Sequence, residues 1–177
     1  MPDREFPPYG YVPGHWPHPE NDPDGHSCDD EEPVRTPLDP ENWWDCPDYL
    51  FGIDLFNYGY YWEAHESWEQ LWHAAGRSGV TADFLRAMIK FAAAGVKVRQ
   101  GNSRGIERHA SNAIDEFDRI AQRIDGTHFC GFSPEELQSY GKRIRDRGDY
   151  DADPDASCEI VFSFSLMPER MDGPGMP

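Results

Sequence analysis

Hydrophobic positions between residues 48 and 124 recur at helical spacing and predict three main helices. The first covers residues 48–75, with a break near Gly59 as an alternative, and stops at Gly76, a residue type common at helix C-termini. The second covers residues 81–99 and the third residues 103–124. The connections are short, which favours antiparallel neighbours in a helical bundle.

Two further elements are predicted on the C-terminal side. Ser133 and Pro134, followed by two glutamates, are a start signal for a short fourth helix that ends near Asp146. Over residues 158–166 hydrophobic and other positions alternate, which predicts a half-buried β-strand. A single strand needs a partner, which the N-terminal segment or a second subunit of a homo-oligomer could supply.

The first 42 residues are rich in proline, which removes backbone donors and favours extended geometry. Phe6, Tyr9 and Trp16 are unusual in a disordered tail, so we expect an extended arm that lies on the folded part. The predicted fold class is all-α. Its parts are the arm (1–42), the antiparallel bundle (43–147) and a C-terminal extension (148–177) with the strand near 158–166.

The composition restricts the partners and the compartment. The chain has 177 residues, and its 33 acidic and 16 basic residues give a net charge of −17. Such an acidic protein repels nucleic-acid phosphates and anionic membrane surfaces. No run approaches the roughly 18 apolar residues of a membrane span. The four cysteines are far apart, which favours free thiols in a reducing compartment. We therefore expect a soluble, cytoplasmic protein.

The candidate chemistry is concentrated in residues 61–76, YWEAHESWEQLWHAAG. On a helical wheel, Trp68 falls on the face expected to form the core. His65 points into the seam between the first two helices, Glu69 lies at the edge of that seam, and Glu63 points to solvent.

His65 and Glu69 allow three interpretations. They are a buried polar pair that ties the first helix to the second helix or to the arm. Alternatively, their spacing of four residues lets them hold part of a divalent metal site, such as a zinc site. In the third, Glu66 beside them acts as a catalytic base. A zinc protease would need histidine where Glu69 stands, so that class is not indicated.

Other residues could complete the seam. Trp62 could line a ligand pocket there. Lys90, with Arg86 and Lys97, forms a basic stripe on the second helix that is either a solvated face or a partner for acidic residues or an anionic ligand. The arm offers further metal ligands, one of which could fold back onto His65; they are His15, His18, His26 and Cys28.

Two blocks of sequence carry a resemblance to a known family. The first is the E-A-H-E-x-x-E-x-x-W run from Glu63 to Trp72, and the second comprises Ala92–Ala94 and Arg99–Asn102. Over about residues 50–124 the chain resembles the family catalogued as domain of unknown function 309. The resemblance implies a small all-α bundle of about three helices without an established activity. Lys90 departs from the glutamine that the family commonly carries there.

The sequence lacks a glycine-rich phosphate loop and a nucleophile elbow. This absence of a complete catalytic set favours a non-enzymatic module that binds a small molecule or a protein at the seam. The alternative is a metal-dependent enzyme of the hydrolase type, in which His65 and Glu69 are the ligands and Glu66 is the base.

Overall fold

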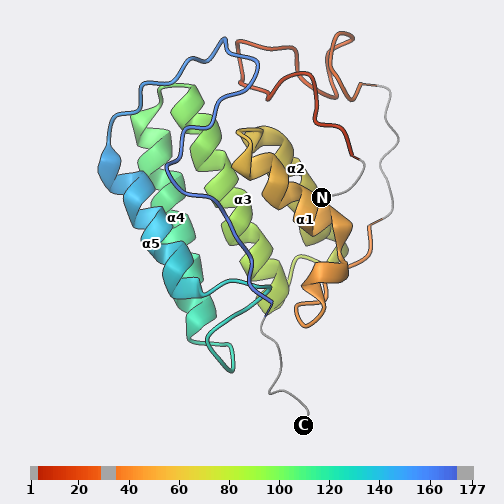
Figure 1. Cartoon of the computed structure of the whole chain (residues 1–177), viewed down its shortest axis with the longest axis vertical. Helices are drawn as coiled ribbons and strands as arrows, with labels where there is room; N and C mark the ends of the chain where they lie inside the picture. Colours follow the sequence, from red (N-terminus) through yellow and green to blue (C-terminus); the bar gives the residue numbers. More distant parts are fainter. Residues whose placement is uncertain (1–3, 29–34, 171–177) are drawn as a thin grey trace.

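The computed structural model describes residues 4–28 and 35–170, and these residues form an all-α fold without β-strands (Figure 1). Each helix packs on the next one along the chain. After a short 3-10 turn at Trp43–Asp45, the helices are α1 (Pro47–Asn57), α2 (Tyr61–Ala74), α3 (Val80–Arg99), α4 (Ser103–Ala121) and α5 (Pro134–Arg147). The predicted all-α class is confirmed, but the described residues form five α-helices rather than three main helices and a fourth.

The additional helix arises because the first predicted helix is divided at Gly59. This residue has a φ angle of +89°, in the left-handed region that favours glycine. A Cβ atom there would lie 2.3 Å from the carbonyl oxygen of Glu159. The turn between α1 and α2 therefore depends on glycine for both its conformation and its close contact with the C-terminal segment.

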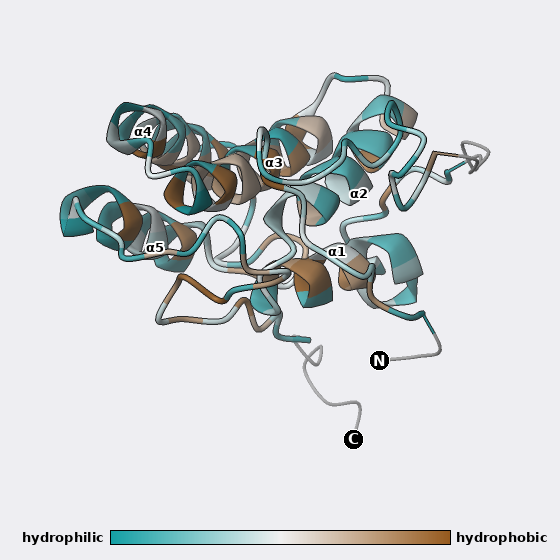
Figure 2. Cartoon of the chain, turned by 90° about the horizontal axis from the view of Figure 1, so that it is seen from above, coloured by the Kyte–Doolittle hydropathy of each residue, from teal (hydrophilic) through white to brown (hydrophobic). Residues whose placement is uncertain are grey.

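Capping residues in the sequence explain where α4 and α5 start. The side chain of Asn102 accepts a hydrogen bond from the Gly105 backbone N–H at 2.9 Å and caps α4. At α5, Ser133 accepts from the N–H of Glu136, and Pro134 is the first helical residue. Figure 2 shows hydrophobic positions on the inner sides of the helices and hydrophilic positions on the outer sides of α4 and α5.

The predicted C-terminal strand is wrong. Residues 158–166 are extended and run along α3 between α5 and α1 (Figure 1), but side chains of helices satisfy their backbone groups. The N–H of Val161 donates to the Tyr61 hydroxyl at 3.0 Å, and that of Leu166 donates to Asn57 Oδ1 at 2.7 Å. The predicted alternation of buried and exposed side chains holds over residues 162–166 but fails at Ile160, which is 58% exposed, and at Val161, which is buried.

The described part of the N-terminal segment lies on α1, α2 and the C-terminal segment. Phe6 stacks on Phe51 with ring centroids 5.9 Å apart, and Val12 is buried. The N–H of Gly10 donates to the Ser157 carbonyl at 2.6 Å. The remaining residues of the predicted arm (1–3 and 29–34) and of the C-terminal extension (171–177) lie outside the described residues. Within residues 4–28 and 35–170, no helix is long and apolar enough to cross a membrane.

Candidate functional site

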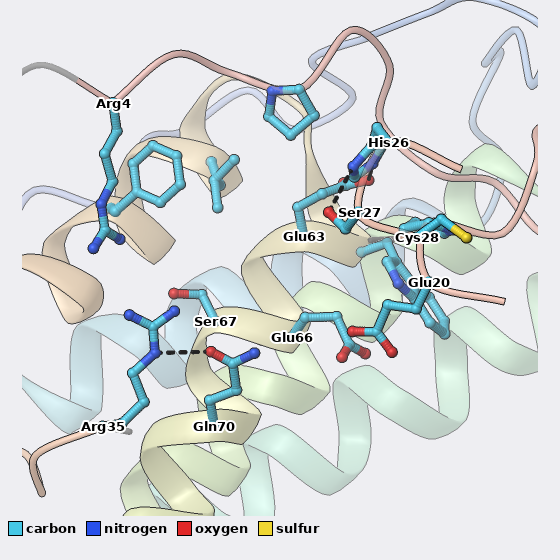
Figure 3. Close-up of a pocket in the computed structure, with 15 residues that line it drawn as sticks. Arg4, Glu20, His26, Ser27, Cys28, Arg35, Glu63, Glu66, Ser67 and Gln70 are labelled. Atoms are coloured by element: carbon cyan, nitrogen blue, oxygen red, sulfur yellow. Dashed lines mark hydrogen bonds and ion pairs between the residues drawn. The ribbon is translucent and has the colours of Figure 1, made fainter. Parts of the chain in front are cut away.

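A pocket of about 550 Å³ lies between the N-terminal segment and helices α1 and α2 (Figure 3). Phe51 and Leu55 of α1 and Trp62 of α2 form an apolar wall. Residues from the N-terminal segment, among them Pro7, Pro19 and His26, cover it. Trp62 thus lines a pocket, and most of the opposite wall comes from residues that lie far from it in the sequence.

Glu63 is a buried carboxylate at this pocket, only 8% exposed. Its Oε1 atom accepts the backbone N–H of Tyr11 at 2.8 Å and lies 3.2 Å from His26 Nε2. The expectation that Glu63 points to solvent is therefore wrong. The helical wheel assigned its direction correctly as away from the bundle core, but the N-terminal segment covers that side of α2.

The hydrogen bonds determine the tautomer of His26. A carboxylate is only an acceptor, so His26 Nε2 must carry the hydrogen that it shares with Glu63. In the neutral imidazole, Nδ1 is then an acceptor, and it lies 3.0 Å from Ser27 Oγ (Figure 3). The Ser27 hydroxyl donates to it. Glu63 Oε2 is left buried, with no hydrogen-bond partner in the part of the chain that the structure describes.

The charges in the pocket are separated (Figure 3). The carboxylates of Glu63, Glu66 and Glu20 lie toward one end, and the guanidinium groups of Arg4 and Arg35 lie toward the other. Arg4 pairs with Asp48 at 2.7 Å. Arg35 also pairs with Asp48, and it donates to the side-chain oxygen of Gln70 at 2.9 Å. The two arginines are therefore bound to the protein itself.

The row Ser27–His26–Glu63 has the residue types of a serine nucleophile, its base and an orienting carboxylate. Its surroundings oppose that chemistry. Acyl transfer places negative charge on the carbonyl oxygen in the transition state, and it needs hydrogen-bond donors or cations there. Glu63 and Glu66 place negative charge around this part of the pocket instead. The arrangement is suited to binding rather than to acyl transfer.

His65, Glu66 and Glu69 come together on the outer side of α2. His65 Nδ1 lies 3.2 Å from Glu66 Oε1 and 3.9 Å from Glu69 Oε2, and one ligand atom of each residue lies within 4.8 Å of the others. They form a candidate metal-binding group. The His65 side chain is 21% exposed, and its ring stacks on Trp62 at 5.4 Å. Trp62 and Glu66 also line the pocket, so this group adjoins it.

Lys90 lies on α3 but faces α4 rather than the residues of α2. Its amino group donates to Glu116 Oε1 at 3.1 Å, and Arg86 donates to the same carboxylate. Burial acts to raise the pKa of Glu116, but the hydrogen bonds from Arg86 and Lys90 outweigh it and hold this pKa below its usual value. Arg86 and Lys90 therefore stabilise the α3–α4 contact, whereas Lys97 donates to Gln100 at the end of its own helix.

The histidines of the N-terminal segment have three different partners. His15 pairs with Asp155 at 2.8 Å, and the His18 ring lies against Trp62 at 5.7 Å. His26 pairs with Glu63, which sequence reasoning had not considered as its partner. A buried glutamate two residues before His65 has no distinguishing local pattern, so only the path of the N-terminal segment identifies it.

Comparison with known families matches residues 49–109 to the family described as Domain of unknown function (DUF309). The comparison with curated proteins and the comparison with solved structures gave no match. The matched range contains α1, α2, α3 and the start of α4, and with them the site residues Trp62, Glu63 and His65. His26 and Ser27 lie outside it. The chain thus contains a DUF309 domain over residues 49–109, in agreement with the resemblance of its E-A-H-E-x-x-E-x-x-W run.

Proposed function

We propose that the protein binds a small molecule in the pocket between the N-terminal segment and α2. The observation that carries this proposal is Glu63 Oε2, which is buried without a hydrogen-bond partner among the described residues. Burying such an atom costs free energy, which a ligand that donates to it would offset. The volume of about 550 Å³ is within the range of roughly 300–1,000 Å³ typical of small-molecule sites.

The lining supports a small ligand over a protein partner. Phe51, Leu55 and Trp62 provide apolar surface, and a few polar groups are placed at the two ends. This combination of an apolar wall with a small number of oriented polar groups is typical of ligand pockets. A protein interface would need a much larger continuous surface than this pocket provides.

Heteronuclear NMR of the ¹⁵N-labelled full chain tests the proposal with a panel of small amines, carboxylic acids and alcohols. At least one class should shift the amide signals of His26, Ser27 and Glu63 and leave those of α5 unchanged. Ser67→Met, which narrows the pocket from α2, should weaken binding about tenfold, whereas Ser103→Met on the exposed start of α4 should not. If no class of compound shifts the amide signals of these pocket residues, the proposal is contradicted.

The group His65, Glu66 and Glu69 supports a second candidate function, the binding of a divalent metal such as zinc. Two ligand atoms about 2.1 Å from a zinc ion lie at most about 4.2 Å apart. The distances from His65 Nδ1 to the two carboxylates, 3.2 and 3.9 Å, meet this condition. With Glu66 as a third ligand, a fourth position stays open for water, as a metal-dependent hydrolase needs.

Titration calorimetry with zinc chloride tests this second function. The wild type, freed of metal by dialysis, should bind about one zinc ion, and His65→Ala or Glu69→Gln should weaken binding at least about tenfold. His128→Ala removes another partly buried histidine, after α4, and should leave the affinity unchanged. Equal binding by wild type and His65→Ala would rule out this site.

A further inference from the structure

We infer that the ligand of the pocket carries a primary ammonium group, which binds between Glu63 and Glu66. This inference rests on the proposed small-molecule function and adds the chemical class of the ligand. It follows from the hydrogen bonds of Glu63, the neighbouring carboxylates and the apolar wall.

Glu63 requires a donor, and its charge requires a cation. Oε1 is used by the Tyr11 N–H and by His26, whereas Oε2 is free to accept. No lysine or arginine of residues 4–28 and 35–170 pairs with Glu63. A buried carboxylate without a full positive counter-charge is costly, and hydrogen bonds from a charged donor are stronger than those from a neutral one. An ammonium group meets both requirements, because it is positively charged and carries only donors.

A second carboxylate lies one helical turn away. Glu66 follows Glu63 by three residues, which corresponds to about 4.5 Å along the axis of α2, and it lines the same pocket. Figure 3 shows the carboxyl groups of Glu66 and Glu20 pointing toward one another. Because like charges at short distance repel, a cation that binds beside Glu63 and Glu66 reduces the repulsion at this end of the pocket.

The rest of the pocket suits an alkyl chain. Phe51, Leu55 and Trp62 give the pocket apolar surface, and Arg4 lies over the Phe51 ring at 5.3 Å. Arg4 and Arg35 are bound to Asp48, at the other end from Glu63 (Figure 3). Neither arginine therefore neutralises the charge of Glu63. Trp62 adds attraction, since aromatic rings favour nearby cations.

A series of compounds with the same carbon chain tests the inference: butylamine, 1,4-diaminobutane, 4-aminobutanoate, butanoate and butanol. Each is titrated into the ¹⁵N-labelled full chain at fixed ionic strength. The three compounds with an ammonium group should shift the amide signals of His26, Ser27 and Glu63, whereas butanoate and butanol should not. A comparison of 1,4-diaminobutane and 4-aminobutanoate with butylamine then measures whether a second ammonium group or a carboxylate changes the affinity at the end of the pocket where Arg4 and Arg35 lie.

Three variants assign the effect to individual carboxylates. Glu63→Gln should weaken butylamine binding at least about tenfold, because a buried charge pair is lost. Glu66→Gln should weaken it about threefold, since its side chain is partly exposed. Glu107→Gln removes the same charge from an exposed position of α4 and should have no effect. If Glu63→Gln fails to fold, the butylamine affinities of Glu66→Gln and Glu107→Gln are compared, and weaker binding by Glu66→Gln alone supports the inference.

Two outcomes would overturn this inference alone. Butanoate or butanol could bind the pocket more tightly than butylamine, which leaves the small-molecule function standing with another ligand class. Amines could instead shift signals over the whole acidic surface, with equal weakening by Glu66→Gln and Glu107→Gln, which identifies non-specific counter-ion binding. If neither this series nor the wider panel shifts the pocket signals, both the inference and the proposed function fail.

Discussion

Replacing Trp68 with alanine is expected to lower the free energy of unfolding by about 3–5 kcal/mol, the cost typical of removing a large buried aromatic side chain. Trp68 is 0% exposed at the contact between α1 and α2. Its indole Nε1 donates to the Tyr49 carbonyl at 3.3 Å. Gly52 lies so close that a Cβ atom there would be 2.3 Å from this nitrogen. The substitution therefore leaves a cavity and removes the hydrogen bond from the indole to the Tyr49 carbonyl.

Urea denaturation followed by circular dichroism measures this loss. Trp44→Ala is the matched control, because Trp44 is only partly buried at the edge of the core. It should cost about 1 kcal/mol, in the ordinary range for single substitutions. If the two variants lose the same free energy, Trp68 does not have the role in the core that its burial indicates.

Gly95→Ala is expected to destabilise the protein by about 1–3 kcal/mol, although alanine is the better helix former by about 1 kcal/mol. A Cβ atom on Gly95 of α3 would lie 2.4 Å from Cγ of Tyr61 in α2. The Tyr61 ring cannot move away easily, because it is 2% exposed and its hydroxyl accepts the Val161 N–H. The substitution must therefore separate α2 from α3 or displace the C-terminal segment.

Thermal unfolding compares this variant with Gly105→Ala in α4. At Gly105 a Cβ atom would meet only side-chain atoms, with Lys97 Cγ at 2.8 Å and Cγ of the capping residue Asn102 at 3.1 Å. We expect a smaller loss there than at Gly95, because the helix propensity of alanine offsets part of the cost of moving these side chains. A lower melting temperature for Gly105→Ala than for Gly95→Ala would contradict the interpretation of the α2–α3 contact.

These contacts affect the site because three faces of α2 have different roles. Tyr61 and Trp68 pack against α3 and α1. Glu63 faces the pocket under the N-terminal segment, and His65 with Glu69 lies on the outer side. A helix held firmly by its core face presents the carboxylates at fixed positions, which is what a binding site for a small cation requires.

Much of the fold is determined locally and could be predicted from the sequence. Hydrophobic spacing identifies the helices, and Ser133 is predicted as a cap because capping involves residues within one turn. The family resemblance follows from two spaced blocks, the E-A-H-E-x-x-E-x-x-W run and the block of Ala92–Ala94 and Arg99–Asn102. The break at Gly59 was only an alternative, since its close contact with Glu159 is a long-range feature.

The tertiary structure decided the rest. The burial of Glu63, its pairing with His26 and the backbone partners of Val161 each join residues at least 37 positions apart in the sequence. Local patterns give the direction of a side chain relative to its own helix, but not which distant segment covers it. The apolar alternation of residues 158–166 predicts a strand because it is also a local pattern, which does not show the groups that the backbone will bind. An extended segment satisfies its backbone wherever donors and acceptors are available, and here the side chains of Tyr61 and Asn57 provide them.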